Sequence, residues 1–150
     1  MDASELFKTG RRTARSVVGM TVTFSAIGLA VADMTTSLAF YRRLGLDFPP
    51  GAEKEGHVET ELPGGIRLMF DTVASLKEFD PAFEPEGPGG PSLAFLCDGP
   101  AEVDRVHNEL EEAGHTSVKK PWDAAWGQRY AQVKDPDGNH VDLFAWLRKS

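Results

Sequence analysis

The sequence predicts an α+β fold in which two βαβββ modules form a cup-shaped mixed sheet around a cavity, with the helices on the convex side. Two observations predict it: a strand followed by an amphipathic helix occurs twice, and a hairpin pattern follows each helix. One such module cannot bury both faces of its curved sheet, so two copies are expected to share a cavity. We expect modules at 21–75 and 91–147, joined by a Pro- and Gly-rich linker, and a flexible arm at 1–20.

The C-terminal hairpin is the most informative stretch. Residues 128–134 alternate between apolar and polar, and the sequence DPDG at 135–138 forces a turn because Pro fixes φ and Gly accepts a positive φ. The return strand at 140–144 has one apolar face, while its other face carries an imidazole, a carboxylate and a ring. This mixed face predicts either a pocket wall or a solvated surface, and for Asp142 both interpretations stay open.

The first half begins with a strand followed by a helix. Residues 21–31 are rich in strand-forming types, Asp33 is a good N-cap, and apolar residues recur on one face of the expected helix from Met34 to about Leu44. Gly45 then ends the helix. Strands are expected at 57–62 and 66–70 around a Pro-Gly-Gly turn, followed by a short helical turn at 74–79.

The second half repeats this order. Residues 92–97 form an apolar strand, Pro100 opens a helix that ends at Gly114, and a strand at 116–118 precedes the hairpin. When Ser92 is placed on Ala26, and Gly138 on Gly65, apolar positions match apolar positions. The register supports an internal repeat.

Composition excludes several classes of protein. The chain has 150 residues, 41% hydrophobic and 26% charged, and no apolar run approaches the roughly 18 residues of a membrane span. Its net charge of −7 argues against a nucleic-acid partner. The single cysteine, Cys97, is expected to pack as a small hydrophobe in a reducing, cytoplasmic setting, and the first residues lack the apolar core of a secretory signal.

Several short motifs occur in a specific order and spacing. They are GLAVAD at 28–33, SLAFY at 37–41, WG at 126–127, DPDGN at 135–139 and VDL at 141–143. In this order they resemble the vicinal oxygen chelate superfamily, the group of glyoxalase I, extradiol dioxygenases and bleomycin-resistance proteins. The resemblance covers roughly residues 21–147.

The resemblance places four metal-ligand positions at Ala26, Met69, Ser92 and Asp142. Metal-dependent members carry His or Gln and then Glu there. Here a methyl group, a thioether and a neutral hydroxyl accompany one carboxylate, and this set is unsuited to a divalent ion. We therefore expect no metal and no cofactor at these positions.

The aromatic residues predict a binding cavity. Trp126 matches the position from which bleomycin-resistance-type members stack a ring on flat ligands, and other rings are expected on the same face. Phe40 and Tyr41 on the first helix are interpreted as structural. The predicted ligand-binding set is Trp126, Trp122, Tyr130, Phe144, Met69, Asp142 and His140.

The other polar candidates are interpreted as surface. His107 is expected to be solvated on the second helix and His115 to lie in a loop. Ser92 has no His and Asp partners in the spacing of a hydrolytic triad, and Lys119 and Lys120 are expected to be ordinary surface charge.

The first functional hypothesis is a metal-independent protein that sequesters a planar or aromatic small molecule, as in antibiotic resistance of the bleomycin-resistance type. The resemblance also implies a homodimer. The alternative is an enzyme, a lyase, isomerase or dioxygenase. It would use a divergent divalent-metal site formed by His57, His140 and Asp142, or Asp142 or His140 as a metal-free general base. A third hypothesis is a protein-interaction module without a small ligand.

Overall fold

The computed structural model describes residues 22–85 and 92–148. The predicted arm at 1–20 therefore lies outside the described residues. The elements of the first module are β1 (Ala26–Val31), α2 (Met34–Arg43), the 3-10 helix η1 (Ala52–Lys54), β2 (His57–Glu61), β3 (Arg67–Thr72) and α3 (Val73–Phe79). The elements of the second module are β4 (Leu93–Leu96), α4 (Pro100–Glu112), β5 (Ser117–Ala124), β6 (Gln128–Lys134) and β7 (His140–Trp146).

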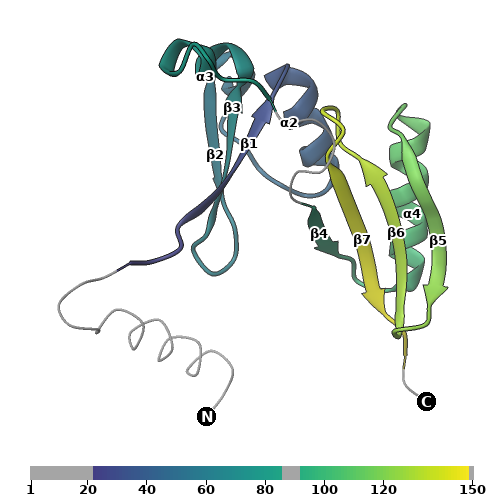
Figure 1. Ribbon diagram of the computed structural model, residues 1–150. Helices are drawn as coiled ribbons and strands as arrows, with labels where there is room; N and C mark the ends of the chain where they lie inside the picture. The colour runs from purple at the N-terminus through teal and green to yellow at the C-terminus, as the bar shows by residue number, and fades with distance from the viewer. Residues whose placement is uncertain (1–21, 86–91, 149–150) are drawn as a thin grey trace.

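Each module has its own sheet (Figure 1). The first sheet has the strand order β1-β3-β2 and the second the order β4-β7-β6-β5. In both sheets the first strand of the module lies parallel to the last strand, and the remaining pairs are antiparallel. The predicted α+β class and both hairpins are confirmed.

The first module differs from the predicted βαβββ pattern. Its sheet has three strands, and the stretch between α2 and β2 holds η1 where the second module has a strand. Pro49 and Pro50 begin this stretch, and proline has no N–H to donate to a ladder. Gly51 then adopts a positive φ of 80° and turns the chain into η1.

The helices begin where the sequence predicts. Asp33 caps α2 by accepting a hydrogen bond from the backbone N–H of Thr36, and a second hydrogen bond, from the Thr36 hydroxyl, is the main cause that lowers the pKa of the Asp33 carboxyl. Pro100 opens α4, and Gly114, with a φ of 97°, follows its end. α4, with 13 residues, is the longest helix in the described part, where none is long and apolar enough to cross a membrane.

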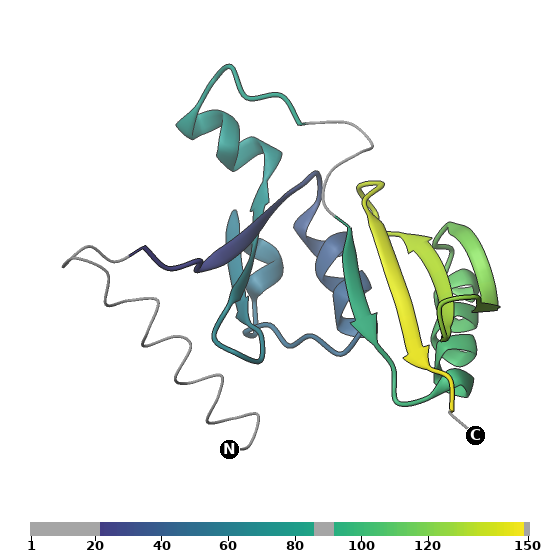
Figure 2. The ribbon, with the colours of Figure 1, turned by 60° about the horizontal axis from the view of Figure 1, so that its bottom comes forward.

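Helix α2 lies between the two sheets (Figure 2). The Tyr41 ring lies 5.2 Å from the ring of Phe70 in the first sheet and 6.3 Å from that of Phe95 in the second. Phe40 and Tyr41 are fully buried, which confirms their structural role. One apolar cluster therefore joins the helix-covered faces of both sheets.

The turn between β6 and β7 binds the first module through two carboxylates. The backbone N–H of Ala32 donates to Asp137 at 2.8 Å, and the Ser37 hydroxyl donates to its other oxygen at 3.1 Å. The Tyr41 hydroxyl donates to Asp135 at 2.7 Å, and Asp135 is only 4% exposed. The DPDG stretch thus reverses the chain and also binds α2 of the first module, through Asp137 at the N-terminal end of the helix and through Asp135 at Tyr41 near its C-terminal end.

The prediction that His107 is solvated is wrong. His107 is 1% exposed, because it lies one helical turn from Val103 and Leu110 on the face of α4 that packs on the sheet. Its Nε2 atom lies 2.7 Å from the hydroxyl of Ser117 on β5, which provides a polar partner inside the core. The sequence analysis missed this face because the acidic residues Glu109 and Glu111 lie close to His107 in the sequence.

Candidate functional site

The open face of the second sheet carries a row of aromatic rings. Trp122, Tyr130 and Phe144 are register partners across β5, β6 and β7, so their side chains share one face. Leu96 of β4 continues the row, and it is 65% exposed. We call the following set the aromatic face: Trp122, Trp126, Tyr130, Phe144 and Trp146.

The rings of the aromatic face form a continuous series. Trp122, Trp126 and Tyr130 contact one another edge to face, with ring centroids 5.5 to 5.9 Å apart. Tyr130 and Phe144 are stacked at 6.1 Å, and Phe144 meets Trp146 at 6.3 Å. These separations lie in the range that aromatic pairs prefer, so the rings hold one another in position.

Trp126 and Trp146 are exposed although they are held in place. Trp126 is 60% and Trp146 63% exposed. The indole N–H of Trp126 donates to the side-chain oxygen of Gln128 at 2.8 Å, which fixes the orientation of the ring. Trp126, Gly127 and Trp146 line an open hollow of about 610 Å³ at this end of the sheet, with Leu147 and Arg148. A pre-oriented but uncovered indole is typical of a binding surface.

Asp142 lies beside the aromatic rings and is held by three side-chain donors. The hydroxyl of Tyr130 donates to one of its oxygens, and the amide of Gln132 donates to the other at 2.7 Å. The hydroxyl of Ser92 adds a longer contact at 3.4 Å. Burial, together with Asp142, raises the pKa of Tyr130 to about 12, so Tyr130 remains a neutral donor at physiological pH.

The structure brings most of the predicted set together. Trp122, Trp126, Tyr130, Phe144 and Asp142 share the open face of the second sheet. His140 lies on the same face at the exposed start of β7. Met69 lies on β3 in the other sheet, beside Gly28 and Glu59.

Two residues of this face were missed by the sequence analysis. Trp146 has the same parity as Asp142 and Phe144, so extending the return strand by two residues would have found it. Lys119 was interpreted as plain surface charge. Its ammonium group lies 4.9 Å from the centroid of the Trp122 ring. Strand parity did not predict this contact, because the pairing of β5 with β6 shifts register twice, between Ser117 and Lys119 and between Lys119 and Trp122.

The open face of the first sheet is polar instead. His57 contacts Asp71 through Nδ1 at 2.6 Å and Glu59 through Nε2 at 2.7 Å. Arg67 donates to the other oxygen of Glu59 at 2.9 Å. The hydrogen bonds that His57 forms to Glu59 and Asp71 raise its pKa, since both favour the protonated imidazole.

The four positions that the resemblance assigns to a metal carry Ala26, Met69, Ser92 and Asp142. Ala26 contributes no donor, Met69 is a thioether in the first sheet, and Ser92 only supports Asp142. Asp142 already accepts three hydrogen bonds. Within residues 22–85 and 92–148, no group of three or more His, Cys, Asp or Glu side chains is placed to hold a metal ion.

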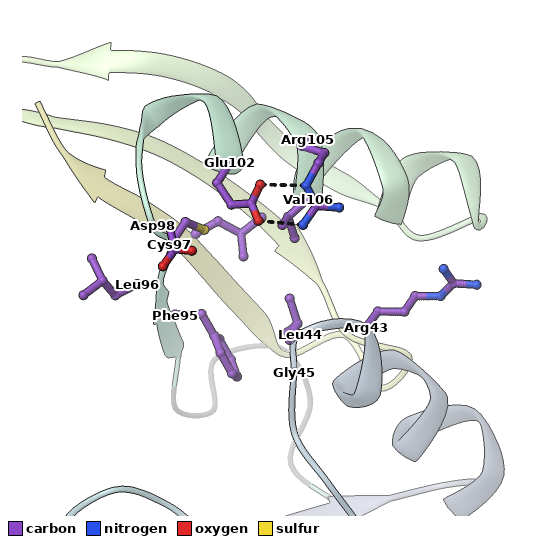
Figure 3. A pocket seen from close by; sticks show the side chains of 11 residues that line it. Arg43, Leu44, Gly45, Phe95, Leu96, Cys97, Asp98, Glu102, Arg105 and Val106 are labelled. Atoms are coloured by element: carbon purple, nitrogen blue, oxygen red, sulfur yellow. Dashed lines mark hydrogen bonds and ion pairs between the residues drawn. The ribbon is translucent and has the colours of Figure 1, made fainter.

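A second hollow of about 260 Å³ lies between the end of α2, β4 and the start of α4 (Figure 3). Two of its charged side chains pair with each other, because Arg105 donates to both oxygens of Glu102 at 2.6 and 2.7 Å. Cys97 lines it and packs against the core, as predicted, and burial followed by the nearby Glu102 raises the pKa of its thiol. A thiol of raised pKa is a poor nucleophile at neutral pH, so this hollow offers no activated group.

The paired module sheets with a parallel first and last strand define the class of fold found in glyoxalases and their relatives. The sequence profile of the Glyoxalase/Bleomycin resistance protein/Dioxygenase superfamily matches residues 23–143. The chain belongs to this superfamily.

Solved structures agree on the fold. A hypothetical protein from S. aureus has a TM-score of 0.70 at 21% identity, covering 84% of this chain and 95% of its own. A glyoxalase-related enzyme from Fulvimarina pelagi has a TM-score of 0.70 at 22% identity, covering 82% of this chain and 87% of its own. A glyoxalase/bleomycin resistance protein/dioxygenase from Nocardioides has a TM-score of 0.64 at 23% identity, covering 99% and 96%. A comparison with curated proteins finds no match.

Proposed function

We propose that this protein is a metal-independent binding protein that sequesters a planar or aromatic small molecule on its aromatic face. The observation that carries the proposal is Trp126, which is 60% exposed and yet held by a hydrogen bond to Gln128. An indole that is oriented before binding loses little conformational freedom when a flat ligand stacks on it. The hollow beside Trp126 and Trp146 leaves room for such a ligand.

The unsuitable donor set at the four family positions supports the metal-independent form of this proposal. Lewis-acid chemistry on two adjacent substrate oxygens needs a metal held by several strong donors, and of these four residues Asp142 alone carries a charged one. The metal-free enzyme hypothesis is weaker for a separate reason. Tyr130, Gln132 and Ser92 donate three hydrogen bonds to the Asp142 carboxylate, which offers about four lone-pair sites, so little of it is left to accept a substrate proton.

We also propose that two copies of the chain pair in solution. The open face of the second sheet carries exposed apolar groups, including Leu96 and Trp146 at 65% and 63%. Patches of this kind are usually covered by a ligand or by another chain. Light scattering after size exclusion would give the mass of a dimer, and a monomeric mass at micromolar concentration would refute the pairing.

Replacing Trp126 with Ala tests the binding proposal. The variant should bind quinoline, a planar neutral probe, at least about tenfold more weakly, because stacked aromatic anchors dominate such interfaces. Its melting temperature should change little, since the ring is mostly exposed. Titration calorimetry measures the affinity independently of the tryptophan signal.

Phe79→Ala is the matched control. Phe79 is an aromatic side chain, 90% exposed, at the end of α3 in the first module. Its removal should leave quinoline affinity unchanged. Equal affinity of the wild-type protein and Trp126→Ala would contradict the proposed function.

A further inference from the structure

We propose that the aromatic face selects planar ligands with a positive charge, and that the ammonium group of Lys119 occupies the place of that charge until a ligand displaces it. The inference rests on the proposed function, and it names the chemical class of the ligand. Three features of the face carry it: the ring that already holds a cation, the carboxylate beside the rings, and the neutral donors around that carboxylate.

Lys119 shows that a cation is stable on this face. Its Nζ atom lies 4.9 Å from the centroid of the Trp122 ring, within the distance at which an ammonium group is attracted to the face of an indole. Lys119 is exposed, so its long side chain can leave the ring without opening the core. A ligand cation placed over the same ring would gain the same attraction after Lys119 moves away.

Asp142 supplies a negative charge next to the rings. The groups that hold it are the phenol of Tyr130, the amide of Gln132 and the hydroxyl of Ser92, and all three are neutral. No Lys, Arg or His side chain of the described residues forms an ion pair with it. Neutral donors fix the carboxylate in position while its charge stays available to a ligand.

The position of Asp142 relative to the rings favours a cation over an anion. Its carboxylate accepts a hydrogen bond from the hydroxyl group of Tyr130, and Tyr130 is the register partner of Trp122. A positive charge over Trp122 therefore meets a negative ring face, and the Asp142 carboxylate lies beyond the adjoining Tyr130 ring. Among the described residues, the basic side chains on this face are Lys119, then Lys134 and His140 at the next register position, and Arg148, which lines the hollow beside Trp126 and Trp146.

Three probes of nearly the same shape test the inference at pH 7: N-methylquinolinium, which is permanently cationic, quinoline, which is neutral, and quinoline-2-carboxylate, which is anionic. Titration calorimetry with the full chain should give an affinity for N-methylquinolinium at least about fivefold above that for quinoline. Quinoline-2-carboxylate should bind more weakly than both.

Two lysine variants test the role of Lys119. Lys119→Met removes the competing cation and should raise the affinity for N-methylquinolinium about three- to fivefold, with little change for quinoline. Lys120→Met is the matched control, because it removes the same charge one residue away. Lys120 contacts Glu111 on α4 at 3.1 Å, on the other side of the sheet, so its removal should change the affinity less than about twofold.

Asp142→Asn tests the carboxylate. It should weaken N-methylquinolinium binding about fivefold more than it weakens quinoline binding, and a circular-dichroism spectrum like that of the wild-type protein shows that the variant is folded. If no probe binds to the wild-type protein, the proposed function fails. If quinoline binds as well as N-methylquinolinium, or quinoline-2-carboxylate binds best, the inference is overturned while the proposed function stands. Equal effects of Lys119→Met and Lys120→Met overturn the role of Lys119.

Discussion

Replacing Tyr41 with Phe removes a single hydroxyl group from the contact between the two modules. That hydroxyl donates to Asp135 at 2.7 Å, in a region where Tyr41 is fully buried and Asp135 is 4% exposed. Asn139 remains as a donor to the same carboxylate oxygen at 2.9 Å. Water has little access to the vacated position, so the carboxylate loses one hydrogen bond without replacement.

The expected cost is about 2 kcal/mol in the free energy of unfolding, within the range measured for hydrogen bonds to charged groups. Urea denaturation followed by circular dichroism measures this cost, provided that the slope m is unchanged. Tyr130→Phe is the matched control, because it removes the same atom from a hydrogen bond to Asp142 on the partly exposed open face. Water can replace that donor, so the control should cost about 0.5 kcal/mol. If both variants lose the same stability, burial of the Asp135 contact is not what holds the modules together.

Two further predictions concern the first module. The pKa of His57 is raised by its hydrogen bonds to Glu59 and Asp71, so the stabilisation from these contacts is complete below the unfolded pKa of about 6.5 and is lost as pH rises through the higher folded value. His57→Gln should therefore lower the free energy of unfolding more at about pH 5.5 than at about pH 9, and an equal loss at both would contradict this linkage. A Cβ atom at Gly56 would lie 1.9 Å from Oγ of Ser75, so Gly56→Ala should cost about 1–3 kcal/mol by displacing α3. Adding Ser75→Ala should recover part of that loss in thermal unfolding, and no recovery would mean that another contact causes the cost.

Local signals determined much of the fold. The cap of Asp33, the proline at the start of α4 and the DPDG turn act through hydrogen bonds and backbone preferences within a few residues, so the sequence alone predicts them. Strand parity works in the same way. It separated Val141 and Leu143, which are buried, from the open face that carries Asp142.

Local signals failed where the partner of a residue lies far along the chain. His107 looks solvated beside its acidic neighbours, and only the packing of α4 on β5 buries it against Ser117. The two register shifts in β5 likewise have no signature in the sequence, and they bring Lys119 to Trp122. Such placements depend on how elements dock, which propensity does not encode.

The sequence by itself determined the α+β class, the order of the elements, the superfamily resemblance and most of the rings that line the candidate site, because each depends on periodicity and short motifs. Only the tertiary structure decided that Tyr41 joins both sheets, that Asp135 and Asp137 fasten a turn to a helix about 100 residues earlier, and that Met69 lies apart from the aromatic face. These features are contacts between side chains that are distant in sequence. They arise when the apolar faces of both modules are buried together in one core.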